Sequence, residues 1–225
     1  INGEYPLMES DGVGKVEQGH NRYSVFSLWD TYRNLHQLMT LVYPERQLDM
    51  VRSMISMYKE WGWMPKWELF SRETFTMEGD PAIPVITDTW LKGLRDFDVN
   101  TAYEAFLKSA ETPGKDNLMR PDVDPYLEKG YIPLGSYSAD LSGDNSVSHA
   151  LEYYIADHAL SLLAADLGHK EDAERFRARS LQYKNYYCPD FGTLRPLTQD
   201  GKFLEPFNPR QGENFEPVPG FHEGS

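Results

Sequence analysis

The stretch SVSHALEYYIADHALSLLAADL, residues 146–167, decides the fold class. Its apolar residues recur three and four positions apart, the spacing that brings side chains onto one face of an α-helix. This face holds Val147, Leu151, Tyr154, Ile155, His158, Leu162 and Leu163. Gly168 follows, and glycine is typical of the position just after a helix C-terminus. The spacing therefore predicts a long amphipathic helix that ends before Gly168.

Helical spacing continues on both sides of this stretch. It predicts further helices over residues 28–42, 44–61, 80–94, 100–110 and 170–187. Prolines and glycines separate these segments, and the alternating pattern typical of β-strands is almost absent. The sequence therefore predicts an all-α fold.

The predicted helices and loops have the arrangement that a helical toroid requires. Antiparallel helix pairs joined by alternating short and long loops can close around a central pit, toward which the loops point. No exact internal repeat is present, which disfavours a regular solenoid. We expect residues 1–24 to form an irregular lead-in loop and residues 25–225 to form part of such a toroid.

Composition narrows the classes of function. The net charge is -13 and no cluster of lysines and arginines is present, so nucleic acid is not an expected partner. No apolar run approaches the roughly 20 residues of a membrane-spanning helix. Cys188 is the only cysteine, so no internal disulfide can form. The chain opens on Ile1 and closes on Phe221–Ser225 without the features of a natural terminus, and we expect it to be a piece of a longer protein.

The first candidate site lies where the lead-in gives way to helix. Trp29, Asp30 and Arg33 occur within five positions there. A carboxylate at this point can accept hydrogen bonds from two sugar hydroxyls, and an aromatic ring can stack on a sugar. The alternatives are that Asp30 is only a helix N-cap paired with Arg33, and that Trp29 is a core residue.

A second candidate segment is the loop over residues 62–68. It contains Trp63, Trp67 and Glu68, so that two rings and a carboxylate lie close together. Stacking combined with a hydrogen-bond acceptor favours sugar binding, while the alternative is a rigid aromatic plug between two helices. Asp80, which precedes Pro81, is better explained as a helix cap than as a ligand.

Glu223 is the best candidate for a catalytic acid. Cleavage of a glycosidic bond needs one carboxylic acid to protonate the leaving oxygen and a second carboxylate to activate water or to attack. His222 and Gly224 flank Glu223 in a way that fits a loop lying close to a ligand, although a solvated glutamate is the alternative. His149 and His158 lie within the predicted long helix, where a structural role is favoured. Motifs of zinc proteases, nucleotide-binding loops and serine hydrolases are absent.

Several segments, in order along nearly the whole chain, resemble the bacterial α-mannosidases of glycoside hydrolase family 92. The segments that carry the resemblance are Val25–Arg33, Leu41–Pro44, Gly79–Pro84, Gly130–Pro133, Leu151–Tyr153, Arg179–Ser180, Tyr183–Asn185 and His222–Gly224. Ser225 departs from the family pattern, which has asparagine at this position. Taken together and in this order, the segments are specific to the family, whereas any one of them is not.

The resemblance implies an N-terminal β-sandwich domain followed by an (α/α)6 toroid, and calcium-dependent, inverting exo-hydrolysis of α-mannosides. Glu223 would be the general acid. Trp29, Asp30, Arg33, Trp67 and Glu68 would line or support the mannose pocket. The expected substrate is terminal mannose, α-1,2-linked, on N-glycans or mannans, and the expected location is periplasmic, cell-surface or secreted.

The same resemblance implies that the catalytic base and most calcium ligands lie beyond Ser225. We therefore expect this chain to be inactive alone, because inverting hydrolysis has no base without the second carboxylate. Two alternatives stay open at this point: another (α/α)6 glycosidase, such as an α-glucosidase, and a non-catalytic carbohydrate-binding helical protein. An acidic cluster downstream of Glu223 would favour catalysis over binding alone.

Overall fold

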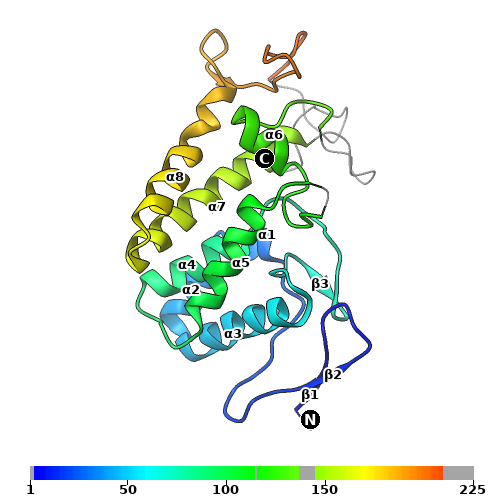
Figure 1. The fold of residues 1–225 in the computed structure, drawn as a ribbon, viewed down its shortest axis with the longest axis vertical. Helices are drawn as coiled ribbons and strands as arrows, with labels where there is room; N and C mark the ends of the chain where they lie inside the picture. The colour runs from blue at the N-terminus through cyan, green and yellow to red at the C-terminus, as the bar shows by residue number, and fades with distance from the viewer. Residues whose placement is uncertain (1–2, 115, 137–144, 210–225) are drawn as a thin grey trace.

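The long helix at residues 146–167 is the element around which the fold is built. The computed structural model describes residues 3–114, 116–136 and 145–209, and helices dominate this part of the chain (Figure 1). The α-helices are α1 (Leu28–Thr31), α2 (Leu35–Val42), α3 (Pro44–Trp61), α4 (Ala82–Leu91), α5 (Val99–Glu111), α6 (Val123–Lys129), α7 (Ser146–Leu167) and α8 (Lys170–Ser180). The predicted helical fold class is confirmed.

Three antiparallel hairpins accompany the helices, and the sequence analysis did not predict them. They pair β1 (Glu4–Pro6) with β2 (Val13–Lys15), β3 (Glu68–Leu69) with β4 (Arg72–Glu73), and β5 (Tyr187–Cys188) with β6 (Thr193–Leu194). Each strand has only two or three residues, too short for an alternating pattern to stand out. The first hairpin lies in the expected lead-in, beside α3 and β3 (Figure 1).

α7 lies between α4 and α8, and its packing differs from the prediction (Figure 1). Ile155 and Leu162 were expected on the buried stripe, but they are 43% and 44% exposed. Alanine and serine positions elsewhere on the helix are buried instead, because small side chains let neighbouring helices approach closely. The helix is therefore buried on more than one side, and the single-stripe prediction is wrong for these two residues.

The ends of several helices also differ from the prediction. Residues 28–42 form two helices instead of one, α1 and α2, separated at residues 32–34. α8 ends at Ser180 and continues as a 3₁₀-helix, η1 (Leu181–Tyr186). α6 was not predicted, because Pro125 reads as a helix breaker, yet it lies in the first turn, where proline is tolerated. The glycine caps are confirmed: Gly62 and Gly168 both adopt left-handed conformations, with φ of 91° and 87°.

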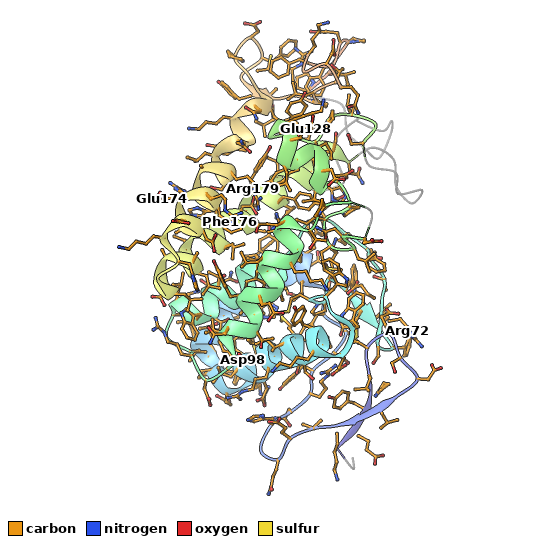
Figure 2. All side chains as sticks on the ribbon, viewed as in Figure 1. Arg72, Asp98, Glu128, Glu174, Phe176 and Arg179 are labelled. Carbon is orange, nitrogen blue, oxygen red and sulfur yellow. The ribbon has the colours of Figure 1, made fainter. Side chains whose placement is uncertain are left out.

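The apolar core has two parts. The larger part is formed mainly by buried side chains of α3, α4, α5 and α7, and Phe176 of α8 joins it. The smaller part surrounds the first half of α7 and contains four buried tyrosines, Tyr126, Tyr153, Tyr154 and Tyr186. On α8, Phe176 and Arg179 point toward the interior, whereas Glu174 points away from it (Figure 2).

Candidate active site

The structure brings the two predicted site segments together at the start of α1. The Leu28 backbone N–H donates to the carbonyl of Lys66 at 3.2 Å, which ties α1 to the loop at residues 62–68. The Glu68 carboxylate strengthens this link, since it accepts from the backbone N–H groups of Val25 and Phe26. Val25 has a φ of 63°, a strained conformation for a β-branched residue, and its hydrogen bond to Glu68 holds it there.

Glu68 stabilises the backbone of the site and does not line its surface. Its side chain is fully buried. Burial raises the pKa of this carboxyl group to about 7, while the hydrogen bonds from Val25 and Phe26 act in the opposite direction. Its contribution in the structure is to order the backbone that leads into α1.

Glu68→Gln should remove one pH dependence of folding. The folded protein binds this proton more tightly than the unfolded chain does, so wild-type stability should fall as pH rises from about 4.5 to about 7. The size of this loss is on the order of 3 kcal/mol. Glutamine keeps an acceptor for the two N–H groups and cannot ionise. Urea unfolding at several pH values should therefore show the variant gaining stability relative to wild type across this range, and a constant difference would refute this role.

Trp29 of α1 and Arg33, in the turn that follows α1, form one stacked unit. The Arg33 guanidinium lies 4.8 Å from the centre of the Trp29 ring, and its Nε donates to the Trp29 carbonyl at 3.1 Å. Arg33 does not form the predicted pair with Asp30. Its Nη2 donates instead to Glu152 of α7 at 3.0 Å. Trp29 is half-buried and packs against the larger core, so that it combines a packing role with partial exposure.

Asp30 is exposed beside this unit. The alternative of an N-cap is wrong, because the N-cap position belongs to Ser27 and Asp30 lies within the first turn of α1. Its carboxylate accepts from the Ser27 hydroxyl. An exposed carboxylate next to a partly exposed tryptophan is an arrangement suited to binding sugar hydroxyls.

The two tryptophans of the second segment have different environments. Trp63 is buried and lies under the Lys108 ammonium, 4.2 Å from its ring centre, which agrees with the aromatic-plug alternative. Trp67 is half-buried, and its backbone N–H donates to the Glu73 carboxylate at 3.0 Å. Of the two rings, only Trp67 keeps enough exposure to contact a ligand.

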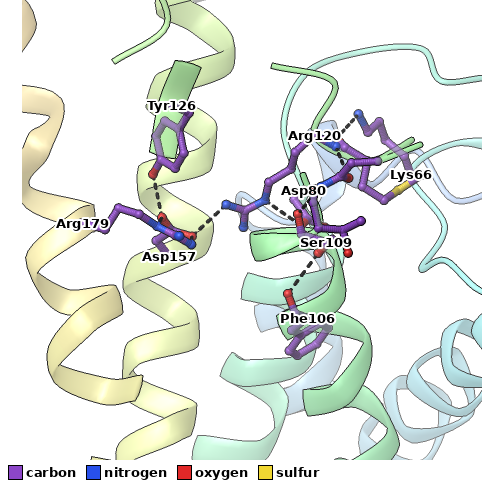
Figure 3. Close-up of polar contacts among 11 residues, drawn as sticks. Lys66, Asp80, Phe106, Ser109, Arg120, Tyr126, Asp157 and Arg179 are labelled. Carbon is purple, nitrogen blue, oxygen red and sulfur yellow. Dashed lines mark hydrogen bonds and ion pairs between the residues drawn. The ribbon is translucent and has the colours of Figure 1, made fainter. Parts of the chain in front are cut away.

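The sequence analysis missed a buried ionic network that joins α7 to α8 and to the segment before α4 (Figure 3). Asp157 of α7 accepts from Arg120 at 2.8 Å, from Tyr126 at 2.6 Å and from Arg179 of α8 at 2.9 Å. Arg120 also pairs with Asp80 at 3.0 Å. Two carboxylates and two guanidinium groups therefore balance in charge. We call these five residues the Asp157 network.

Asp80 owes its position to this network and not to helix capping. It was expected to cap the helix that begins near residue 81, but no side-chain hydrogen bond caps α4. Its carboxylate instead accepts from Arg120 and from the Ser109 hydroxyl at 2.6 Å. Burial would raise the pKa of the other carboxyl, Asp157, yet the charges of Arg120 and Arg179 hold it below its usual value.

His149 and His158 have the structural roles that were predicted for them. His149 is buried, and its Nε2 lies 2.7 Å from the Glu78 carboxylate. The His158 ring contacts Arg177 of α8, with 2.9 Å between Nδ1 and Nη1. Lys66 is buried nearby and donates to the Met119 carbonyl at 3.3 Å, and burial lowers the pKa of its ammonium group. The loop at residues 62–80 is thus anchored to α7 by buried polar contacts.

The family follows from comparison with known proteins. The model of the glycosyl hydrolase family 92 catalytic domain matches residues 1–225. The chain belongs to this family. A structure of a family 92 α-mannosidase from Bacteroides thetaiotaomicron in complex with mannoimidazole is 32% identical, with a TM-score of 0.82, and the match covers 92% of this chain and 26% of that chain. A family 92 inverting mannosidase from the same species is 25% identical, with a TM-score of 0.85, over 99% of this chain and 28% of that chain.

A curated relative also matches. It is a protein of Arthroderma benhamiae named as an uncharacterized secreted glycosidase, 30% identical over 151 residues, which are 65% of this chain and 19% of that protein. This family 92 chain therefore spans about a fifth of the length of this relative and about a quarter of the length of the two solved structures.

Two predictions for this family 92 chain lie outside what the structure describes. Glu223, the predicted general acid, falls beyond residue 209, so its role stays a prediction. Within residues 3–114, 116–136 and 145–209, no three His, Cys, Asp or Glu side chains are grouped so as to hold a metal ion. Across the same described ranges, no helix combines the length and apolar character needed to cross a membrane.

Proposed function

We propose that the complete protein is a calcium-dependent, inverting exo-α-mannosidase that releases terminal α-linked mannose, with α-1,2 linkages as the expected substrate. The observation that carries the proposal is the exposed Asp30 carboxylate beside the stacked Trp29 and Arg33, in a chain of family 92. The two similar Bacteroides proteins, an α-mannosidase and an inverting mannosidase, support the substrate class and the stereochemistry.

In this mechanism the described residues bind and orient the sugar. Asp30 accepts hydrogen bonds from mannose hydroxyls, and the partly exposed Trp29 and Trp67 pack against the ring. Glu223 protonates the leaving oxygen while a carboxylate from elsewhere in the protein activates water on the opposite face, so that the configuration inverts. When bound, calcium would hold sugar hydroxyls as a Lewis acid. Its ligands come from residues outside the described part.

The experiment that tests the proposal is release of mannose from an α-1,2-linked mannobiose by the full-length protein, with added calcium and with excess chelator. We expect release with calcium, a loss of at least roughly tenfold on chelation, since ligand removal abolishes what the metal contributes, and recovery when calcium returns. Unchanged release in chelator would refute the calcium requirement. No release in either condition would refute the mannosidase and favour a binding protein or another glycosidase. Release by the isolated chain at the full-length rate would refute its expected inactivity.

We also propose that residues 25–225 belong to an (α/α)6 toroid completed by helices from the rest of the protein, preceded by a β-sandwich domain. An apolar face on α2 supports this. Leu35, Leu38, Leu41 and Val42 share one side of the helix and are 40%, 55%, 77% and 52% exposed. Four exposed apolar side chains on one helix face are costly in water and typical of a surface that another element covers.

Leu41→Lys should test whether this face is covered. In the full-length protein the change would place a charge in an apolar contact, and we expect a loss of about 2–4 kcal/mol in unfolding free energy. Leu127→Lys on α6, a leucine that is 40% exposed, provides the control for adding charge and should cost less than about 1 kcal/mol. Thermal and chemical denaturation measure both. Equal small effects would mean that α2 faces solvent in the complete protein.

The proposed location is outside the cytoplasm: periplasmic, cell-surface or secreted. The name of the Arthroderma benhamiae relative, a secreted glycosidase, supports this. Polymeric mannans and N-glycans are too large to cross a membrane intact, so an enzyme that trims their ends has to meet them outside the cell.

A further inference from the structure

Glu152 joins two helices that are far apart in the sequence. It lies on α7, and its two carboxylate oxygens accept hydrogen bonds from consecutive residues at the end of α1. The Tyr32 hydroxyl donates to Oε2 at 2.8 Å, and Arg33 Nη2 donates to Oε1 at 3.0 Å. Both oxygens are therefore engaged by these two partners, and Trp29 also hydrogen-bonds to this side chain. The carboxylate fixes the end of α1 against α7.

The contact passes from Glu152 to the ring of Trp29. Arg33 is held by Glu152 on one side, and on the other its guanidinium lies over Trp29 and donates to the Trp29 carbonyl. The same guanidinium lies 5.0 Å from the centre of the Tyr32 ring. A planar guanidinium held by a carboxylate has a fixed plane, so the group stacked beneath it also has a fixed orientation.

Glu152 is itself held rigidly. Its side chain is only 13% exposed. Gly79 packs against it so closely that a Cβ atom at residue 79 would lie 2.6 Å from the Cβ of Glu152, and the φ of Gly79 is 79°. One helical turn earlier on α7, His149 pairs with Glu78, the residue before Gly79. Residues 78–80 therefore pack directly against the face of α7 that carries His149 and Glu152.

The proposed sugar-binding residues, Asp30 and Trp29, are therefore held in place by contacts among Tyr32, Arg33 and Glu152. Arg33 is 43% exposed at its side chain, whereas its carboxylate partner is nearly buried. Burial raises the pKa of the Glu152 carboxyl, and the hydrogen bond from Tyr32 and the charge of Arg33 act in the opposite direction. A surface ion pair would leave Arg33 free to move, but this buried carboxylate with two donors does not.

We propose that Glu152 is a positioning residue that sets the orientation of Arg33 and Trp29 for the sugar bound beside Asp30. The inference rests on the proposed function. Glu152 acts by holding Arg33, and it also hydrogen-bonds to Trp29 itself. Its effect on the reaction passes through these two side chains.

A double-mutant cycle in the full-length protein tests this proposal. Glu152→Gln removes the negative charge at nearly constant size, and Arg33→Gln removes its partner. We expect each single change to lower kcat/KM for the mannobiose by roughly tenfold or more, mainly through KM, and to weaken binding of mannoimidazole by a similar factor. In the Arg33→Gln background, Glu152→Gln should cost clearly less than it does alone, because one of the two contacts through which it acts is already lost.

Asp166→Asn is the matched control. It also removes a carboxylate of α7 that binds a tryptophan and an arginine, Trp90 and Arg95, but it lies near the other end of α7, so its effect on kcat/KM should be the same with and without Arg33→Gln. If the double variant loses kcat/KM by the full product of the two single losses, Glu152 and Arg33 act independently. The positioning role is then overturned, even though the wild-type enzyme is active. If wild-type protein neither releases mannose nor binds mannoimidazole, the proposed function itself fails. Circular dichroism and melting temperature identify any variant that has lost its fold.

Discussion

Asp157→Ala should destabilise the protein by about 3–5 kcal/mol, or prevent it from folding, because it leaves buried guanidinium charge without its partner. The carboxylate is fully buried and binds side chains from three segments, Arg120, Tyr126 and Arg179. Arg120 would keep Asp80, but Arg179 has no other carboxylate in the Asp157 network. Chemical denaturation measures the loss.

Tyr126→Phe separates the ionic part of this effect from the neutral hydrogen bond. The change removes only the hydroxyl that donates to Asp157, and the carboxylate keeps both guanidinium partners. We expect a cost of about 1 kcal/mol. If Asp157→Ala costs no more than Tyr126→Phe, the ionic pairs of the Asp157 network do not hold α7 and α8 together.

Glu223→Gln should lower kcat by roughly 10²- to 10⁴-fold in the full-length protein, the range expected when a general acid is lost. Glutamine has nearly the same shape but no proton to give to the leaving oxygen. Mannobiose binding should change little, so KM should stay within about threefold of wild type.

The leaving group provides the control for this assignment. The leaving group of a 2,4-dinitrophenyl α-mannoside departs as a stable phenolate and needs no protonation. Glu223→Gln should therefore retain most of the wild-type rate on this substrate while it loses activity on mannobiose. An equal loss on both substrates would show that Glu223 binds or positions the sugar and is not the acid.

Local pattern predicted the elements that depend on local signals. α3, for example, begins at Pro44 and ends at Trp61, before Gly62, because a proline in the first turn and a left-handed glycine after the last turn are signals that lie within a few residues of each end. α6 was missed for the same reason, since Pro125 reads as a breaker whether it lies in the first turn or in the interior of a helix. A proline in the first turn is compatible with a helix and a proline in the interior is not. The two cases can be told apart only when the first residue of the helix is known, and the sequence around Pro125 does not mark that residue.

The sequence predicted which residues belong to the site, but it did not predict which side chains they contact. Trp29, Asp30 and Arg33 were found because they are close in sequence, yet the partner of Arg33 is Glu152, 119 residues away along the chain. Asp80 was assigned to a helix cap because Asp-Pro is a common helix start, and nothing nearby in sequence points to Arg120. Partners of this kind are fixed by the packing of α1, α4 and α7. Single-sequence patterns carry no information about that packing.

The most direct test of the central claim is proton NMR of the mannose first released from the methyl glycoside of an α-1,2-linked mannobiose by the full-length protein with calcium, because the other product then stays a methyl mannoside and contributes no free anomer. An inverting exo-mannosidase releases β-mannose first, and the α-anomer grows in only as the sugar mutarotates. We predict this order, and we expect no detectable β-mannose signal from Glu223→Gln over the same time. Initial release of α-mannose would contradict the inverting mechanism, and no release of mannose would contradict the assignment of the protein as an α-mannosidase.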